Sequence, residues 1–322
     1  MLNSRWATQQ RNKGVYIIAE AGSSHRGDYH EALALVRAAA EAGADAIKFQ
    51  TYRAEELAAP DVPLLNGYDA AHDAWVERLG VPATLQDLLG KGGLPWPWHA
   101  VLQASAKALG IDFLSTPFSV PAAEFLVTII QVPALKIASG DLTYLPLLTY
   151  ADTCSVPVLL STGGATAMEV RTTLEDILLE AYTDERITLM HCRSIYPCPT
   201  DAVDLRVLQT WKHDFPLAQL GWSDHTTDSD VVPVAAVACG ARVIEKHLRL
   251  TGGGQTPDTD HALNETQFAH MVRRIRATEA ALGSTEKTVH PREKHDRLWA
   301  RRSPTDWLRP TLAARAGQWE EA

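Results

Sequence analysis

Two strand-like runs of the sequence end in a histidine each: WSDH at residues 222–225 and IEKH at residues 244–247. Between them, residues 231–240 form an apolar, alanine-rich run that predicts a helix joining two parallel strands. Both strand ends should then face the same way, with His225 beside His247. Because neutral imidazole nitrogens bind divalent metals, this pair predicts a metal site at one rim of a sheet.

A phrase of helix, glycine and strand recurs along the chain. It is clearest at residues 41–51, 108–116 and 239–247, and each copy is typical of a βα unit. Counting such units predicts strands over residues 15–21, 45–51, 111–116, 134–139, 157–162, 187–192, 219–222 and 242–247. Their near-continuous apolar character is that of parallel strands covered by helices.

Helices are expected between these strands. They are predicted over residues 28–42, 120–130, 144–152, 166–180, 201–213, 229–239 and 264–282. Asp28 and Glu31 predict a capping box at the start of the first helix. The alternation indicates an α/β protein with a (β/α)8 TIM barrel over residues 1–285; a doubly wound open sheet is the main structural alternative.

Two segments do not fit the repeat. Residues 52–95 make a loop between the second predicted strand and the helix that follows it, far longer than usual, carrying Trp75 and leaving through PWPW at 95–98. This loop should fold over the rim as a lid or a subunit contact. After Gly283 the chain turns polar and charged, which predicts a C-terminal tail over residues 286–322 with no independent domain.

Composition narrows the class of partner. The chain has 322 residues, a formal charge of -9 and scattered basic residues, which argues against a nucleic-acid surface and favours small metabolites. Its four cysteines form no CxxC pair, as expected of a reducing cytoplasm. Residues 1–13 are polar, and no apolar run is long enough for a membrane span. We therefore expect a cytoplasmic protein with no membrane partner.

Polar side chains follow every predicted strand, at the end where barrel enzymes carry their chemistry. They are Glu20; Lys48 and Gln50; Thr116; Lys136 and Ser139; Ser161 and Thr162; Ser194 and Tyr196; Ser223 and His225; and Glu245 with His247. A buried ammonium without an anion is costly, so the two lysines and the hydroxyls predict a cradle for phosphate and carboxylate groups. The structural alternative is an ion pair of Lys48 with Glu20, with the hydroxyls capping helices.

These residues resemble the sialic acid synthases and related nonulosonate synthases, from about residue 16 to residue 283. The resemblance rests on nine phrases in order: AEAGSSHRG at 19–27, KFQ at 48–50, FLSTPF at 113–118, KIASG at 136–140, LSTG at 160–163, HC at 191–192 with YP at 196–197, SDHT at 223–226, EKH at 245–247 and PD at 257–258. Each phrase is common alone, and the ordered set is specific.

The resemblance implies a transferase that condenses phosphoenolpyruvate with a sugar aldehyde similar to N-acetylmannosamine. The products are a 2-keto-3-deoxy sugar acid, a sialic-acid-like nonulosonate, and phosphate. His225 and His247 match the ligands of a divalent metal, Mn²⁺ or Mg²⁺. The phosphoenolpyruvate contacts match Lys48, Thr116, Lys136, Ser139, Ser161 and Ser223, and the acceptor positions match Glu20, Gln50, Tyr196 and Asp258. Glu20 or Glu245 could position or deprotonate the water that adds at C2.

The sequence also departs from the family pattern. Ser24 and Arg26 stand where asparagine is usual, Asp141 where glutamate is common, and Ser194 where some members have asparagine. Family enzymes usually continue past a phrase like RRS at 301–303 into an antifreeze-like domain that supplies an arginine to a partner subunit. The sequence stops soon after that phrase, so it is a shortened chain or the enzyme works without that arginine. Our hypothesis is that Arg26, or an arginine of the tail, partly replaces it.

Two other functions stay open from the sequence. One keeps the phosphoenolpyruvate condensation but uses a non-sialic aldehyde, in capsule or natural-product biosynthesis. The other is a catalytically idle barrel that binds a metal and an anion. A homodimer is possible in either case.

Overall fold

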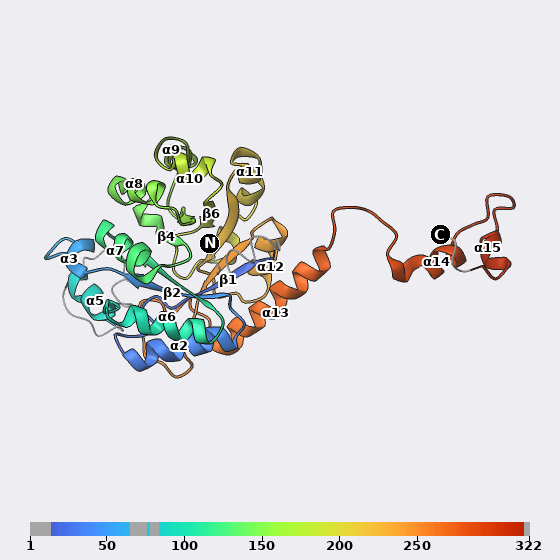
Figure 1. Ribbon diagram of the computed structural model, residues 1–322. Helices are drawn as coiled ribbons and strands as arrows, with labels where there is room; N and C mark the ends of the chain where they lie inside the picture. Colours follow the sequence, from blue (N-terminus) through green and yellow to red (C-terminus); the bar gives the residue numbers. More distant parts are fainter. Residues whose placement is uncertain (1–13, 65–75, 78–83, 319–322) are drawn as a thin grey trace. The chain divides into compact units, whose positions relative to one another are not determined.

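A computed structural model describes residues 14–64, 76–77 and 84–318 of the chain. Its strands are β1 (Tyr16–Glu20), β2 (Ala46–Thr51), β3 (Asp112–Pro117), β4 (Leu135–Ile137), β5 (Val158–Ser161), β6 (Ile187–Cys192), β7 (Gln219–Asp224) and β8 (Val243–His247). They form one parallel sheet in the order β3-β2-β1-β8-β7-β6-β5-β4, and β3 lies beside β4, so the sheet nearly closes (Figure 1). The predicted (β/α)8 barrel is confirmed, and the open sheet is wrong.

Helices surround the strands in Figure 1. They are α2 (Tyr29–Glu41), α6 (Trp98–Ala108), α7 (Val120–Glu124) with a π-helical continuation (Phe125–Ile130), α8 (Leu145–Thr153), α9 (Ala167–Thr172) with a π-helical continuation (Thr173–Ile177), α10 (Leu179–Thr183), α11 (Val207–Asp214), α12 (Val231–Ala238) and α13 (Glu265–Leu282). Each predicted helix is present. The one expected over 201–213 begins only at Val207, because Asp204 has a left-handed φ of 48° that a continuous helix cannot contain.

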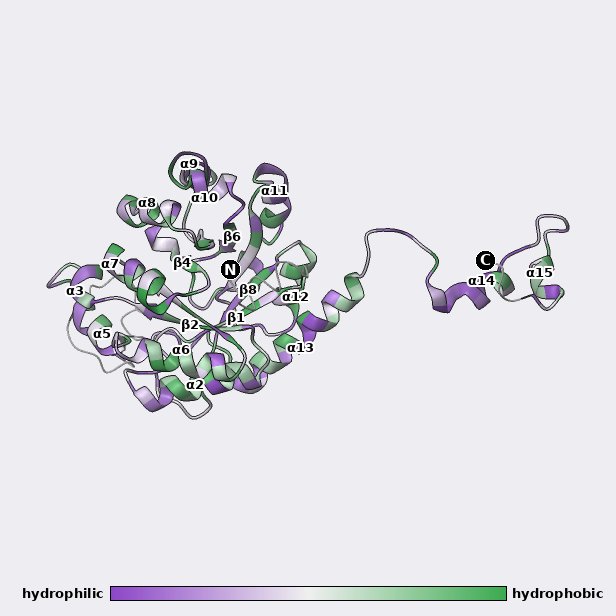
Figure 2. Ribbon diagram, viewed as in Figure 1, coloured by the Kyte–Doolittle hydropathy of each residue, from purple (hydrophilic) through white to green (hydrophobic). Residues whose placement is uncertain are grey.

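Side-chain alternation along the strands builds two cores. Residues that point inward include Ile18, Leu114, Leu159 and Val243, and they pack together inside the barrel. The intervening residues, such as Ile17, pack outward against the helices. In Figure 2 the helices carry both hydrophobic and hydrophilic stretches, as expected of an outer layer. One step beyond the inner core, the same alternation turns the polar strand ends into the mouth of the barrel.

The start of α2 differs in one detail from the prediction. The Asp28 side chain accepts from the backbone N–H of Glu31 at 2.9 Å, as an N-cap should. The Glu31 carboxylate instead pairs with Arg26. The capping box is therefore only half formed, because the arginine takes the carboxylate that would complete it.

The long segment after β2 contains two described helices, α3 (Ala54–Leu57) and α5 (Leu85–Gly92), which pack against each other. Trp75 lies outside the described residues. At the exit of the segment, Trp96 stacks on Phe125 with ring centroids 4.7 Å apart, which fixes the exit to the outer helix layer. A role as lid or subunit contact stays a prediction.

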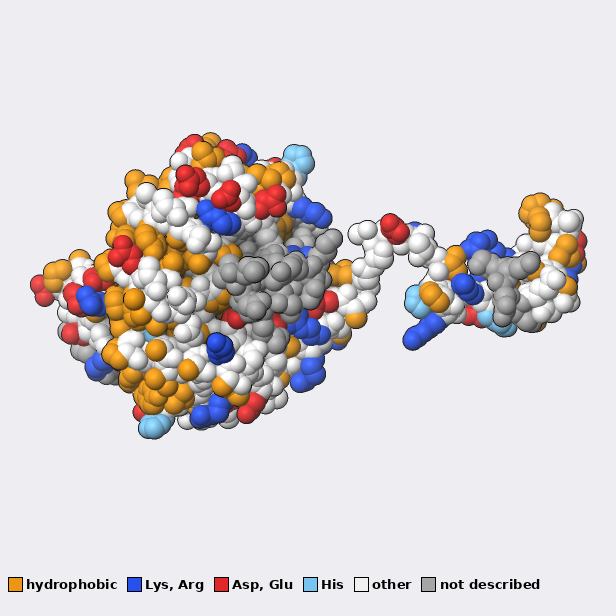
Figure 3. Space-filling model, viewed as in Figure 1, with side chains coloured by type: hydrophobic (Ala, Val, Ile, Leu, Met, Phe, Trp, Pro, Cys, Tyr) orange, Lys and Arg blue, Asp and Glu red, His pale blue; other side chains and the backbone are white. Residues whose placement is uncertain are grey.

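The chain divides into two compact units, Met1–Ala281 and Leu282–Ala322. The second contains a 3-10 turn (Pro291–Glu293), α14 (Lys294–Ala300) and α15 (Leu312–Arg315), and it buries Leu298 and Ala314. The predicted boundary between the barrel and a tail without a domain stays a prediction. Among the described residues, no helix combines the length and apolarity needed to cross a bilayer. Over the barrel in Figure 3, Lys and Arg are interspersed with Asp and Glu.

A buried ion pair ties the last helix of the barrel to its first strands. Asp45, fully buried just before β2, accepts from the Ile17 N–H at 2.9 Å and from Arg276 of α13 at 2.6 Å. The same guanidinium donates to the Val15 carbonyl at 2.6 Å. The pair therefore joins the first two strands of the barrel to its last helix.

We expect Asp45→Ala to lower the free energy of unfolding by about 2 kcal/mol, because it leaves the buried Ile17 N–H without its acceptor and removes one of the two carboxylates that pair with Arg276. The matched control is Arg274→Ala, which removes an exposed pair with Asp230 and should change stability by less than about 1 kcal/mol. Urea denaturation measures both. Similar small losses would contradict the structural role of Asp45.

Candidate active site

Apart from Arg26, the residues that the sequence predicts for catalysis, substrate or metal line one cavity of about 440 Å³ at the C-terminal ends of the strands. These are Glu20, Lys48, Gln50, Thr116, Lys136, Ser139, Ser161, Ser194, Tyr196, Ser223, His225, Glu245, His247 and Asp258. Phe118 and Cys192 also line it and were not predicted. Residues from all parts of the barrel thus meet around a space large enough for a small substrate.

Four charged side chains at the base of this cavity form a balanced cluster. Lys48 Nζ pairs with Glu20 and lies 3.6 Å from Glu245 Oε2, and it donates to Thr116 Oγ1 at 2.9 Å. Lys136 Nζ lies 3.3 Å from Glu245 Oε1. All four side chains are 5% exposed or less. Two ammonium groups and two carboxylates therefore compensate one another.

The expectation from the sequence that both buried lysines need an anionic ligand is wrong. The lysines do not need a ligand to relieve an unpaired charge, because Glu20 and Glu245 supply the counter-charges. The ion pair of Lys48 with Glu20, kept as the structural alternative, is present. An anionic substrate therefore needs positive charge beyond that of the two lysines.

The two carboxylates of the cluster differ in proton affinity. Burial raises the pKa of Glu20 to about 7, although Lys48 acts in the opposite direction. Burial also acts to raise the pKa of Glu245, but Lys136 and Lys48 outweigh it and lower that pKa to about 2. Glu245 thus stays ionised, while Glu20 can exchange a proton near neutral pH. Of the two candidate bases, Glu20 has the suitable pKa.

Hydroxyl groups surround the cluster. Ser223 Oγ donates to Glu245 at 3.1 Å, and Ser139 Oγ accepts from the Gly163 N–H at 2.8 Å. A side chain at Gly163 would collide with Ser194 Oγ and come within 3.0 Å of Ser139 Oγ, so these hydroxyls would have to move. The buried Ser161 Oγ has no hydrogen-bond partner among the described residues and is free to bind a ligand.

Two histidines, His225 and His247, line one side of the cavity, and a third ring packs beside them. The ring centroids of His225 and His247 are 5.5 Å apart, so both predicted metal ligands are neighbours. His261, which was not predicted, has its ring centroid 4.5 Å from that of His247 and 5.6 Å from that of His225. Burial lowers the pKa of all three imidazoles, to about 4 for His225. The rings are therefore neutral at pH 7, the form that binds metals.

The strand ends that carry two of these rings are fixed from outside the barrel. Asp224 Oδ2 lies 3.1 Å from Lys246 Nζ, and both side chains are fully buried. His225 Nδ1 lies 2.8 Å from the Arg193 carbonyl, which can only accept. That contact places the proton on Nδ1 and leaves Nε2 with its lone pair for a ligand.

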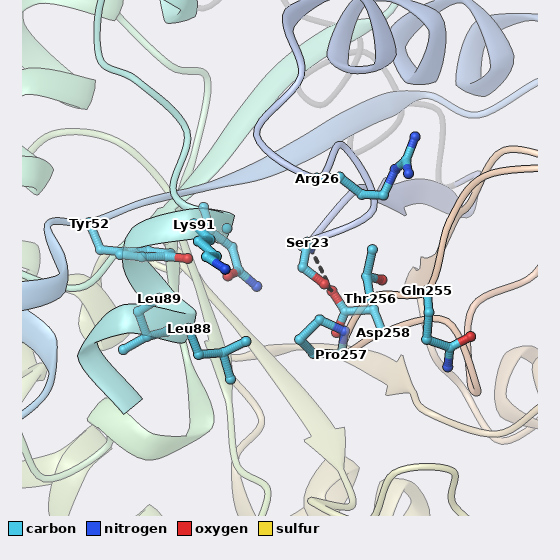
Figure 4. Close-up of a pocket in the computed structure, with 12 residues that line it drawn as sticks. Ser23, Arg26, Tyr52, Leu88, Leu89, Lys91, Gln255, Thr256, Pro257 and Asp258 are labelled. Carbon is cyan, nitrogen blue, oxygen red and sulfur yellow. Dashed lines mark hydrogen bonds between the residues drawn. The ribbon is translucent and has the colours of Figure 1, made fainter. Parts of the chain in front are cut away.

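A second cavity, of about 260 Å³, adjoins the first and shares Gln50 and Asp258 with it. Figure 4 shows its two sides. Tyr52, Leu88 and Leu89 form an apolar wall, in which both leucines come from α5. The opposite side is more polar and is formed by Ser23, Arg26, Gln255 and Thr256.

A (β/α)8 barrel with ionisable groups and imidazoles converging at its C-terminal mouth has the organisation of an enzyme that acts on a small polar substrate. Residues 35–287 match the NeuB family. The protein therefore belongs to the NeuB family, and the family membership predicted from nine short phrases is confirmed.

Individual relatives agree with this assignment. The chain is 36% identical over 296 residues to an N,N'-diacetyllegionaminic acid synthase of Legionella pneumophila, covering 90% of this chain and 79% of that protein. It is 32% identical to a pseudaminic acid synthase of Helicobacter pylori, covering 89% and 81%. A crystal structure of the sialic acid synthetase of Leptospira borgpetersenii superposes with a TM-score of 0.74 at 30% identity, covering 88% and 90%. These likenesses favour a synthase over a catalytically idle barrel.

We expect a Glu20→Gln variant to reduce turnover roughly 100-fold or more, because it loses its proton acceptor. The wild-type rate should rise as the pH passes about 7, where Glu20 ionises, and this limb should be absent from the variant. Initial rates of phosphate release between pH 5.5 and 9 measure both. A variant with an unchanged pH profile would exclude Glu20 as the base.

The same pKa has a consequence for stability. The folded form binds the Glu20 proton more tightly than a carboxyl with the ordinary pKa of 4.5. The binding of this proton therefore adds to the free energy of unfolding. That addition is fully present below pH 4.5 and is lost as the pH rises through about 7. The unfolding temperature of the wild type should fall across this pH window, and this fall should be absent from Glu20→Gln.

Proposed function

We propose that the protein condenses phosphoenolpyruvate with a sugar aldehyde of the N-acetylmannosamine type, giving a 2-keto-3-deoxy nonulosonate and phosphate. The observation that carries the proposal is the single cavity in which the predicted catalytic, substrate and metal residues other than Arg26 meet. Membership of the NeuB family, with named legionaminic and pseudaminic acid synthases as relatives, supports it.

The reaction balances as phosphoenolpyruvate, aldehyde and water going to keto acid and phosphate. The C3 carbon of phosphoenolpyruvate bonds to the aldehyde carbon, and the aldehyde oxygen takes up a proton to become a hydroxyl. Water adds to the resulting cationic C2 with loss of one proton, and departure of phosphate with loss of the C2 hydroxyl proton leaves the ketone. Lys48 and Lys136, with hydroxyls of Thr116, Ser139, Ser161 and Ser223, hold the phosphate and carboxylate groups. Glu20 takes the proton of the water, while Glu245 stays ionised and keeps both lysines in place.

The donor set fits a divalent metal. The rings of His225 and His247 are neutral neighbours, and His247 Nδ1 is buried without a hydrogen-bond partner among the described residues. We assign these two histidines as metal ligands, with Mn²⁺ or Mg²⁺ as the expected ion. When bound, the metal supplies a Lewis acid that polarises the aldehyde oxygen. Because the lysines are already paired, its charge also assists in binding the anionic substrate.

The second cavity suits the part of the acceptor that lies away from its aldehyde. Gln50 and Asp258 line both cavities, so a sugar between them reaches from one to the other. The wall of Tyr52, Leu88 and Leu89 fits a methyl group, as in an acyl or deoxy substituent. Arg26 is already paired with Glu31, and it remains our candidate for the contact that an arginine of the antifreeze-like domain makes in the family. The homodimer and the cytoplasmic location stay predictions.

Phosphate release from phosphoenolpyruvate should require both a hexosamine aldehyde and Mn²⁺ or Mg²⁺. Chelation should abolish the release, and restoring the metal should recover it. The assay uses a panel of aldehydes, with each metal added separately. Release only with other aldehydes would favour the non-sialic acceptor, and no release under any condition would support the idle barrel.

We expect Leu88→Ala and Arg26→Ala each to raise the acceptor Michaelis constant roughly fivefold, the effect of about 1 kcal/mol of lost contact. The constant for phosphoenolpyruvate should not change, because neither residue lines the first cavity. Leu145→Ala, at a leucine that is 56% exposed on α8, is the control. Unchanged acceptor constants and turnover would remove Arg26 or Leu88 from the acceptor site.

A further inference from the structure

The position of His261 goes beyond the pair of ligands proposed above. We propose that His247, Asp258 and His261 form a three-ligand core of the metal site, and that this core makes the site prefer a transition-metal ion to Mg²⁺. This inference rests on the proposed function, because it concerns the metal of the same cavity.

The first observation is the state of the His261 ring. His261 lies in the turn between β8 and α13 and is 2% exposed. Neither ring nitrogen has a hydrogen-bond partner in the part of the chain that the structure describes. A buried imidazole with two unsatisfied nitrogens is unfavourable, so this ring calls for a ligand.

The second observation is geometric. One ligand atom from each of His247, Asp258 and His261 can be chosen so that all lie within 4.8 Å of one another. Asp258 Oδ1 lies 3.5 Å from His261 Nε2 and 3.8 Å from His247 Nδ1. Atoms bound about 2.1 Å from one ion are at most about 4.2 Å apart. Shifts of less than about 1 Å would therefore bring all three onto one ion.

The third observation is the way Asp258 is oriented. Its Oδ2 accepts from both the backbone N–H and the hydroxyl of Ser23, each at 2.6 Å. Gly22 has a φ of +47°, and a side chain there would collide with the same carboxylate. The first turn of the barrel thus holds one oxygen and leaves the other facing the two imidazoles, as outer residues do for metal ligands.

The composition of this core determines the choice of ion. Two neutral imidazoles and one carboxylate give more nitrogen than oxygen. Mg²⁺ prefers oxygen ligands and retains its waters, whereas Mn²⁺, Co²⁺ and Zn²⁺ accept imidazole. His225 lies beside the core, with its ring 5.6 Å from that of His261. As the other ligand assigned above, it completes the shell beside this core.

The alternative to metal binding is that His261 has only a structural role. Its ring packs edge-on against Tyr196 at a centroid distance of 5.2 Å, which could itself explain a buried histidine. In that case, removing its nitrogens would affect packing and leave metal affinity unchanged. Metal binding therefore separates the two roles without reference to catalysis.

The test titrates the metal-free full chain with Mn²⁺, Co²⁺ and Mg²⁺ separately, using calorimetry, the resonance signal of free Mn²⁺ and the visible spectrum of bound Co²⁺. We expect His261→Gln to weaken Mn²⁺ and Co²⁺ binding at least 10-fold and to change the Co²⁺ spectrum. We expect wild-type protein to bind Co²⁺ at least 100-fold more tightly than Mg²⁺. The matched control is His191→Gln, at a buried histidine whose ring is already hydrogen-bonded to the Val203 carbonyl.

Wild-type affinity and an unchanged Co²⁺ spectrum in His261→Gln would overturn the inference and leave the proposed function intact. Equal affinity of the wild type for Mg²⁺ and Co²⁺ would overturn the preference. Should His261→Gln fail to fold, judged by thermal unfolding without metal, Asp258→Asn tests the same core. Failure of the wild type both to bind metal and to release phosphate would refute the proposed function itself.

Discussion

The interaction on which the site depends is the contact of Glu245 with both buried lysines. This carboxylate lies between Lys48 and Lys136, and Glu20 pairs with Lys48 and is ionised above a pH of about 7, so the lysine charges can stay in a dry interior. Their mutual compensation leaves this cluster without a surplus of positive charge. Under the proposed function, a metal ion held by the imidazoles supplies the further positive charge for an anionic substrate.

The barrel meets this requirement through strand alternation. An inward-facing apolar layer supports an inward-facing polar layer directly above it, as Ile18 supports Glu20 and Val243 supports Glu245. Side chains that face outward lock the same strand ends from behind, as Lys246 does with Asp224. Residues that line the site and residues that hold it in place therefore alternate along single strands.

Much of this organisation could be predicted from the sequence. The strands were recognisable because each is a short apolar run bounded by glycine or polar residues, and their ends identified the lining of the cavity. The late start of α11 was not predictable from periodicity, because it depends on the backbone angle of Asp204. His261 was missed for a related reason. It lies in a turn whose path back over the cavity depends on long-range contacts, and a histidine three residues after Asp258 was the only available signal. The pairing of the lysines was equally hidden, since a sequence does not show which charges meet.

The contact between Ser23 and Asp258 spans 235 residues, joining the turn after the first strand to the turn after the last. Such a contact can form only when the first and last strands of the chain, β1 and β8, have paired side by side. An ion that engages Asp258 would bind the finished barrel and not its partly assembled forms, which adds to the stability of the complete fold by mass action. Supply of the ion would then influence how much of the newly made chain reaches its final state.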